Sequence, residues 1–207
     1  MVLVDKPAGP SSFEIVRQLR DRTGARAGHA GTLDPFATGL LLVLLGRATK
    51  LASRFVGLDK RYLAEIDLAT TTTTGDPEGE AEPREPPTHE ELERRLGGVR
   101  GEVDLPIPAY SAVKIEGRRA YKLARRGTTV EMPVRRSVVR ELELLSYDGR
   151  RATLELLVGS GTYVRAVAEA LGGHCSSLRR VAVGPFSVEE ADPERILPPE
   201  DALARLR

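Results

Sequence analysis

The sequence predicts an α+β fold in which helices flank a mixed, mostly antiparallel sheet. Of its 207 residues, 41% are hydrophobic and 29% are charged, which is an ordinary globular composition and excludes a disordered chain. Segments with strand patterns interleave with segments of helical periodicity. The two clearest strands, residues 138–146 and 152–158, flank a turn at 147–149 and therefore predict a hairpin. A hairpin favours this class over a doubly wound parallel sheet.

The amino-terminal part predicts a strand followed by a helix. Residues 1–4 are apolar and predict the start of a strand. Residues 11–22 predict a helix, because Ser11 and Glu14 have capping-box spacing and apolar side chains follow at helical intervals. Gly24 is placed to end this helix.

The next segments carry less decisive patterns. Residues 28–39 contain three glycines and one proline, and they predict a loop. Residues 40–45 form a continuous apolar run, which fits a buried strand or a buried helix equally well. We expect a short helix over 48–56 and an alternating strand over 61–68.

The central part of the chain is more polar. Residues 70–87 are acidic and contain proline, so we expect a mobile loop there. Thr88 and Glu91 have capping-box spacing at the start of a helix over 88–96. A further helix is expected over 118–126.

The carboxyl-terminal part predicts two more helices, over 162–171 and 198–207. No internal repeat is visible, and no linker divides the chain cleanly. The length therefore fits one large domain or two small ones.

Several protein classes are excluded by residue counts and spacing. The single cysteine, Cys175, excludes an internal disulfide framework. The three histidines, His29, His89 and His174, do not have metal-ligand spacing. The longest apolar run is residues 40–45, too short to span a bilayer, and no signal-peptide pattern begins the chain. We therefore expect a cytoplasmic protein without a metal.

The net charge of +1 hides a strong segregation of charge. Residues 59–109 carry 6 basic and 13 acidic side chains, whereas residues 110–165 carry 12 basic and 6 acidic ones. The densest cations of the basic stretch are Lys114, Arg118, Arg119, Lys122, Arg125 and Arg126. Tyr110 and Tyr121 are interleaved with them, which suits a nucleic-acid surface. A solvated amphipathic helix is the alternative interpretation.

One aspartate stands in an unusual setting. Asp34 is a lone carboxylate in a neutral, apolar loop punctuated by glycine. Pro35 restricts the backbone of Asp34, while Gly31 and Gly39 allow another backbone to approach closely. A rigidly held carboxylate suits a nucleophile or a general base. A turn aspartate before proline is the commoner explanation, and composition alone favours it.

These segments belong to a longer series that runs in a fixed order along the chain. The series is 3–12 (LVDKPAGPSS), 31–39 (GTLDPFATG), 60–62 (KRY), 108–114 (PAYSAVK) with 117–127, 160–165 (SGTYVR), 178–180 (LRR) and 184–186 (GPF). Together these motifs resemble those of the tRNA pseudouridine synthase B family.

The resemblance implies a pseudouridine synthase-like fold and a specific reaction. Family members flip a uridine out of the tRNA T loop, at position 55, and convert it to pseudouridine. They break the N1–C1′ bond, rotate the uracil and rejoin it through C5, without a metal or cofactor. The implied organisation is a catalytic domain over 1–190 with a basic, RNA-gripping thumb over about 108–135. Residues 191–207 would be a short helical tail, without a full C-terminal RNA-binding domain.

The resemblance also assigns the reacting groups. Asp34 would be the catalytic carboxylate, and its role stays open between addition to C1′, addition to C6 and action as a base on a glycal intermediate. Arg165 would pair with Asp34 and favour its ionised form. Tyr62 would stack on the flipped uracil, and Tyr163 would line the same pocket. Tyr62 could instead be a core aromatic of its strand.

The remaining assignments concern RNA contacts. Leu178 would close the uracil pocket, although a plain core leucine is nearly as good an explanation. His29 would fill the gap that the flipped base leaves, or stack on neighbouring bases. The cations that would grip phosphates are Lys114, Arg118, Arg119, Lys122, Arg125 and Arg126. The T stem-loop of tRNA is the partner expected, with no membrane, no required protein partner and a monomeric enzyme.

Other functions fit the same sequence less well. The chain could act on another RNA, or it could be a non-catalytic RNA-binding or RNA-folding protein; the presence of Asp34, Tyr62 and Arg165 argues against lost chemistry. A guide-RNA-dependent enzyme is a further alternative. It fits less well, because such relatives need partner proteins and a further RNA-binding domain that this sequence does not show. A glycosidase would need a second acid beside Asp34, and the motif contains none.

Overall fold

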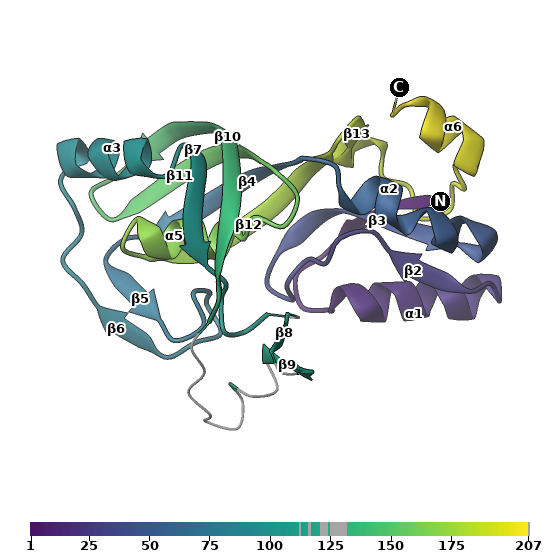
Figure 1. Ribbon diagram of the computed structural model, residues 1–207, viewed down its shortest axis with the longest axis horizontal. Coiled ribbons are helices and arrows are strands. Elements are labelled where there is room, and N and C mark those ends of the chain that lie inside the picture. Colours follow the sequence, from purple (N-terminus) through teal and green to yellow (C-terminus); the bar gives the residue numbers. More distant parts are fainter. Residues whose placement is uncertain (112, 116, 121–123, 125–131, 207) are drawn as a thin grey trace. The chain divides into compact units, whose positions relative to one another are not determined.

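The computed structural model describes residues 1–111, 113–115, 117–120, 124 and 132–206 (Figure 1). The chain forms two compact units. The first comprises Met1–Leu63, Leu156–Ser160 and Leu178–Arg207, and the second comprises Ala64–Glu155 and Gly161–Ser177. The division predicted at residue 190, between a catalytic domain and a tail, stays a prediction.

The main sheet is mixed and mostly antiparallel. Its strand order is β1 (Val2–Lys6), β3 (Thr38–Leu45), β12 (His174–Val183), β4 (Lys60–Asp67), β11 (Arg151–Val158), β10 (Val134–Tyr147) and β7 (Gly101–Pro106). Off this path, β2 (Ala27–His29) pairs with β3, and β13 (Phe186–Ser187) pairs with β12. Antiparallel pairs are β1–β3, β2–β3, β10–β7 and β12–β13, whereas β12 runs parallel to β3. The predicted α+β class is confirmed.

In the first unit, the apolar run at 40–45 belongs to β3 and is buried on both faces. Leu41 and Val43 face a core that includes Ile15 of helix α1 (Ser12–Thr23). Leu40, Leu42 and Leu44 face a second core that includes Phe55 and Phe186. Burial on both faces explains why the run shows no alternation. Of the two alternatives left open by the sequence, the strand is the one observed.

The helices of the first unit follow local sequence signals. The capping box of α1 is present as predicted: Ser11 accepts a hydrogen bond from the Glu14 amide, and the Glu14 carboxylate accepts one from the Ser11 amide. Gly24 ends the helix in the left-handed conformation, and α1 lies alongside β2 (Figure 1). The short helix expected over 48–56 is a 3₁₀ turn, η1 (Gly46–Leu51), followed by α2 (Ala52–Val56).

The carboxyl-terminal part of the first unit contains η2 (Val188–Glu190) and α6 (Pro199–Ala204). Helix α6 confirms the predicted terminal helix, although it is shorter than expected. Leu197 and Ala202 bury their side chains in the same core as Phe55 and Phe186. The tail is therefore packed onto the first unit.

In the second unit, the segment 70–87 is more ordered than expected. A two-stranded sheet forms from β5 (Thr70–Thr72) and β6 (Ala81–Pro83), and the turn between them buries Thr74 and Asp76. The prediction of a loop was wrong over these two strands, and its mobility stays a prediction. Two helices of this unit, α3 (His89–Gly98) and α5 (Val164–Ala170), lie where they were predicted; Thr88 caps α3 by accepting a hydrogen bond from the Glu91 amide.

The predicted hairpin is formed by β10 and β11, which are neighbours in the sheet. Its turn is closed by Asp148, whose carboxylate accepts hydrogen bonds from the amides of Arg150 and Arg151.

The prediction of a helix over 118–126 was wrong at its start, because β9 (Arg118–Arg119) pairs there with β8 (Lys114–Ile115). Ala120 and Ala124 are helical as predicted, and the other residues of that prediction lie outside the described ones. Within the described residues, no helix is long and apolar enough to cross a membrane.

Candidate active site

The loop that carries Asp34 is anchored by α1. The Ser12 hydroxyl accepts a hydrogen bond of 2.8 Å from the Leu33 amide and donates one of 2.9 Å to the Leu33 carbonyl. Both residues are buried, so this double contact fixes the residue that precedes Asp34. On the other side, the Ala37 amide donates to the Asp34 carbonyl at 3.1 Å, which forms a tight turn.

Lys6, at the end of β1, anchors the same loop at the residue that follows Asp34. Its ammonium group is fully buried and donates to the carbonyls of Pro7 (2.7 Å), Pro10 (2.9 Å) and Pro35 (3.2 Å). Burial lowers the pKa of Lys6, and the negative charge of Asp34 partly opposes this effect. The backbone on each side of Asp34 is therefore held by a buried side chain.

Three further predicted residues lie in the first unit with Asp34. Tyr62 on β4 and Leu178 on β12 are each 7% exposed. His29 ends β2 and is half-buried; its Nδ1 atom has no hydrogen-bond partner within the described part of the chain. Burial and the nearby charge of Arg180 lower the pKa of His29, so its imidazole is favoured in the neutral form.

The other two predicted pocket residues lie in the second unit. Tyr163 is the N-cap of α5, and Arg165 occupies the first turn of that helix. The Arg165 guanidinium is buried and donates to the carbonyls of Thr74 and Tyr110, at 2.8 Å each. The predicted pairing of Arg165 with Asp34 joins a residue of each unit and stays a prediction.

Asp76 is a partner of Arg165 that sequence reasoning missed. Its carboxylate lies 3.5 Å from the Arg165 guanidinium and accepts a hydrogen bond from the Thr74 hydroxyl. Glu169, one turn further along α5, has its pKa raised mainly by burial. Asp76 stands among other acidic residues in a polar segment, so neither charge nor periodicity distinguishes it in the sequence.

The cations expected to grip RNA are only partly described. Arg118 is exposed on β9, whereas Lys114 and Arg119 are placed in β8 and β9 by their backbones. Lys122, Arg125 and Arg126 lie outside the described residues. The predicted thumb over about 108–135 therefore stays a prediction.

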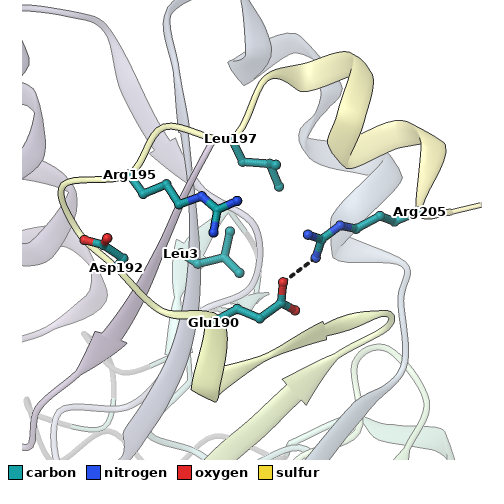
Figure 2. A pocket seen from close by; sticks show the side chains of 6 residues that line it. All are labelled: Leu3, Glu190, Asp192, Arg195, Leu197 and Arg205. Carbon is teal, nitrogen blue, oxygen red and sulfur yellow. Dashed lines mark hydrogen bonds and ion pairs between the residues drawn. The ribbon is translucent and has the colours of Figure 1, made fainter.

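A separate pocket in the first unit contains none of the predicted site residues (Figure 2). It is lined by Leu3, Glu190, Asp192, Arg195, Leu197 and Arg205. The Glu190 carboxylate accepts a hydrogen bond of 2.6 Å from Arg205 across it. Neither here nor in the rest of the described part of the chain could a group of three or more His, Cys, Asp or Glu residues hold a metal ion.

Comparison with known proteins identifies the family. Residues 17–164 match the family model described as "TruB family pseudouridylate synthase (N terminal domain)". The chain belongs to this family. A tRNA pseudouridine synthase B from Mycobacterium sp. (strain KMS) is 43% identical over 218 residues, which cover 99% of this chain and 73% of the relative. The enzyme of the same name from Chromobacterium violaceum is 43% identical, over 92% of this chain and 65% of the relative.

Solved structures agree with the TruB assignment. A chain in the structure of a Cbf5-Nop10-Gar1 complex is 28% identical with a TM-score of 0.69, over 90% of this chain and 49% of that chain. A structure described as a pseudouridylate synthase has a TM-score of 0.51 at 18% identity, which supports the fold alone. The family resemblance that was inferred from the sequence motifs is thus confirmed, and so is the pseudouridine synthase-like fold.

Proposed function

We propose that this TruB family member converts the uridine at position 55 of the tRNA T loop to pseudouridine, with Asp34 as the catalytic carboxylate. The observation that carries the proposal is the Asp34 loop, which is held by buried contacts on both sides in a chain of the pseudouridine synthase family. The bacterial relatives named tRNA pseudouridine synthase B support tRNA as the substrate.

The reaction is an isomerisation, so atoms and electrons balance within the nucleotide. The N1–C1′ bond breaks, the uracil turns, a C5–C1′ bond forms, and the proton on C5 leaves to water while N1 gains one. The target base must be flipped out of the folded T loop before any of these steps. Asp34 would act on C1′ or C6, or as a base on a glycal intermediate.

The other site residues would hold the substrate and the carboxylate. Arg165, fixed by two carbonyls and Asp76, would pair with Asp34 and favour its charged form. Tyr62 would stack on the flipped uracil, with Tyr163 and Leu178 completing the pocket. His29 would occupy the gap left in the T loop, and its neutral form suits stacking better than phosphate binding.

RNA would be gripped by the basic stretch, and the protein would act in the cytoplasm as a monomer without a protein partner. The phosphate contacts would come from Lys114, Arg118, Arg119, Lys122, Arg125 and Arg126. A different RNA substrate is the alternative, because phosphate contacts position an RNA without specifying its sequence.

The test uses a T stem-loop RNA with tritium at C5 of the target uridine. Pseudouridine formation replaces the C5–H bond, so tritium is released into water. We expect release by the wild-type protein without added metal or cofactor, and none by Asp34→Asn with RNA binding retained. Asp21→Asn, a change of an exposed α1 carboxylate, is the matched control and should release tritium normally. Bound RNA without release by the wild type would instead indicate a non-catalytic RNA-binding protein.

A further inference from the structure

Arg180, on β12, is a buried arginine that contacts both ends of the Asp34 loop. Its side chain is among the largest fully buried ones and is 1% exposed. At the start of the loop, its guanidinium donates to the carbonyls of Gly31 (3.1 Å) and Thr32 (3.3 Å). At the end of the loop, Nε donates to the carbonyl of Leu40 (2.8 Å). One planar group thus bridges two chain segments that flank Asp34.

The backbone of Arg180 joins the same structure. Arg180 pairs with Gly39 in the parallel β3–β12 ladder. Gly39 has φ +103°, and a Cβ atom at this position would lie 2.2 Å from the Arg180 carbonyl oxygen. The glycine therefore lets the two strands come close together, and the Arg180 guanidinium can then contact the carbonyls of the loop.

The charge of Arg180 has neutral partners. Its guanidinium donates to the backbone carbonyls of Gly31, Thr32 and Leu40, and within the described residues no carboxylate lies at ion-pair distance from it. Burying a charge without a counter-charge opposes folding, because the charge loses its hydration. Apolar side chains could fill the same volume without this free-energy penalty. The planar fork of arginine, in contrast, is suited to holding several acceptors in a fixed arrangement.

We propose that Arg180 is a positioning residue for the reaction: it ties the two ends of the Asp34 loop together and so sets where the carboxylate stands. This role rests on the proposed function, in which Asp34 is the reacting group. A displacement of about 1 Å at a reacting group can lower a rate about 10²-fold. Ser12 and Lys6 hold the residues next to Asp34. Arg180 holds the two ends of the loop, at Gly31 and Leu40.

The test compares Arg180→Lys and Arg180→Met with the wild type and with Arg95→Met. Arg95 is the matched control, because it also donates to a buried backbone carbonyl, that of Leu171 at 2.8 Å, but belongs to the second unit. Single-turnover tritium release at saturating RNA gives the rate, filter binding gives Kd, and thermal unfolding gives Tm. Hydrogen exchange of the amides of residues 30–40 reports on the loop itself.

We expect both Arg180 variants to lose about 10²-fold in rate, with Kd within about threefold of the wild type, as for an effect on positioning rather than binding. Arg180→Lys keeps the charge but lacks the fork, so it should fold, show faster exchange in residues 30–40 and still be slow. Arg95→Met should lower Tm and leave the rate below Tm unchanged.

Three results would overturn this role. Arg180 variants that turn over at the rate of Arg95→Met would show that Arg180 only stabilises the fold, while wild-type turnover would leave the proposed function intact. Unfolding of both Arg180 variants at the assay temperature would likewise assign Arg180 to stability alone. A wild type that binds RNA but releases no tritium would overturn the proposed function and this role with it.

Discussion

Buried cations gather around the loop that carries Asp34. Lys6, Lys60 and Arg180 are each at most 7% exposed, and each directs its charged group at backbone carbonyls. Lys60 lies close to Gly31, since its Cε atom would be 3.8 Å from a Cβ added there. These positive charges act on one another as well as on the loop.

The lowered pKa of Lys60 gives a pH-dependent prediction. Burial, and then the charge of Arg180, lower the pKa of Lys60 from 10.5 to about 8. Between these two values the unfolded chain keeps the Lys60 proton while the folded protein has lost it, so stability rises with pH in this range. The free energy of unfolding of the wild type, relative to Lys60→Met, should rise with a limiting slope of about 1.4 kcal/mol per pH unit. Denaturant unfolding of both proteins between pH 7 and 10 measures it, and a difference that does not change with pH would contradict the prediction.

At this scale the setting of Asp34, a lone carboxylate before proline and between glycines, left a plain turn residue as the commoner explanation, and its assignment as the catalytic carboxylate came from the resemblance of the motifs. Asp76 and Arg180 were not assigned a role from the sequence. Their functions depend on contacts with Arg165 and with the Gly31 carbonyl, which are distant along the chain. No local pattern of charge or hydrophobicity records such contacts.

At the scale of elements, the pairing of β3 with β12 gives a prediction on glycine. Gly39→Ala places a Cβ 2.2 Å from the Arg180 carbonyl oxygen and requires φ +103° of an alanine. We expect a loss of about 2–4 kcal/mol in the free energy of unfolding, from left-handed strain and overpacking together.

The control for this change is Gly97→Ala, on α3. A Cβ at Gly97 meets nothing within 4 Å. Because alanine favours a helix over glycine, this variant should gain about 0.5–1 kcal/mol. Denaturant unfolding measures both variants, and equal effects at the two glycines would refute the close approach of β3 and β12.

The elements that were predicted correctly are those with local signals. The cap at Ser11 and the stop at Gly24 define α1, and Asp148 closes the β10–β11 turn. Strand β12 was not predicted, because its side chains do not alternate and its position is set by pairing with β3. The β5–β6 pair was missed for a related reason, since its turn is stabilised by Asp76 rather than by apolar burial.

At the scale of the whole molecule, the segregation of charge is a property of the sequence that the fold does not explain. The acidic stretch at 59–109 and the basic stretch at 110–165 nearly cancel in the net charge. Arg118, a cation of the expected thumb, has an exposed side chain. An RNA phosphate backbone is the partner that such a stretch would attract.

The corresponding prediction concerns salt dependence. Arg125→Ala together with Arg126→Ala should weaken binding of the T stem-loop and reduce the slope of log K against log salt by about 1.4–1.8, since each lost phosphate contact removes about 0.7–0.9. Arg20→Ala with Arg22→Ala removes the same charge from arginines that pair with Asp21 and Glu194 in the first unit. This control should leave the slope unchanged. Filter binding between 50 and 300 mM salt measures both slopes, and an unchanged slope in the Arg125/Arg126 variant would mean that these residues do not contact phosphate.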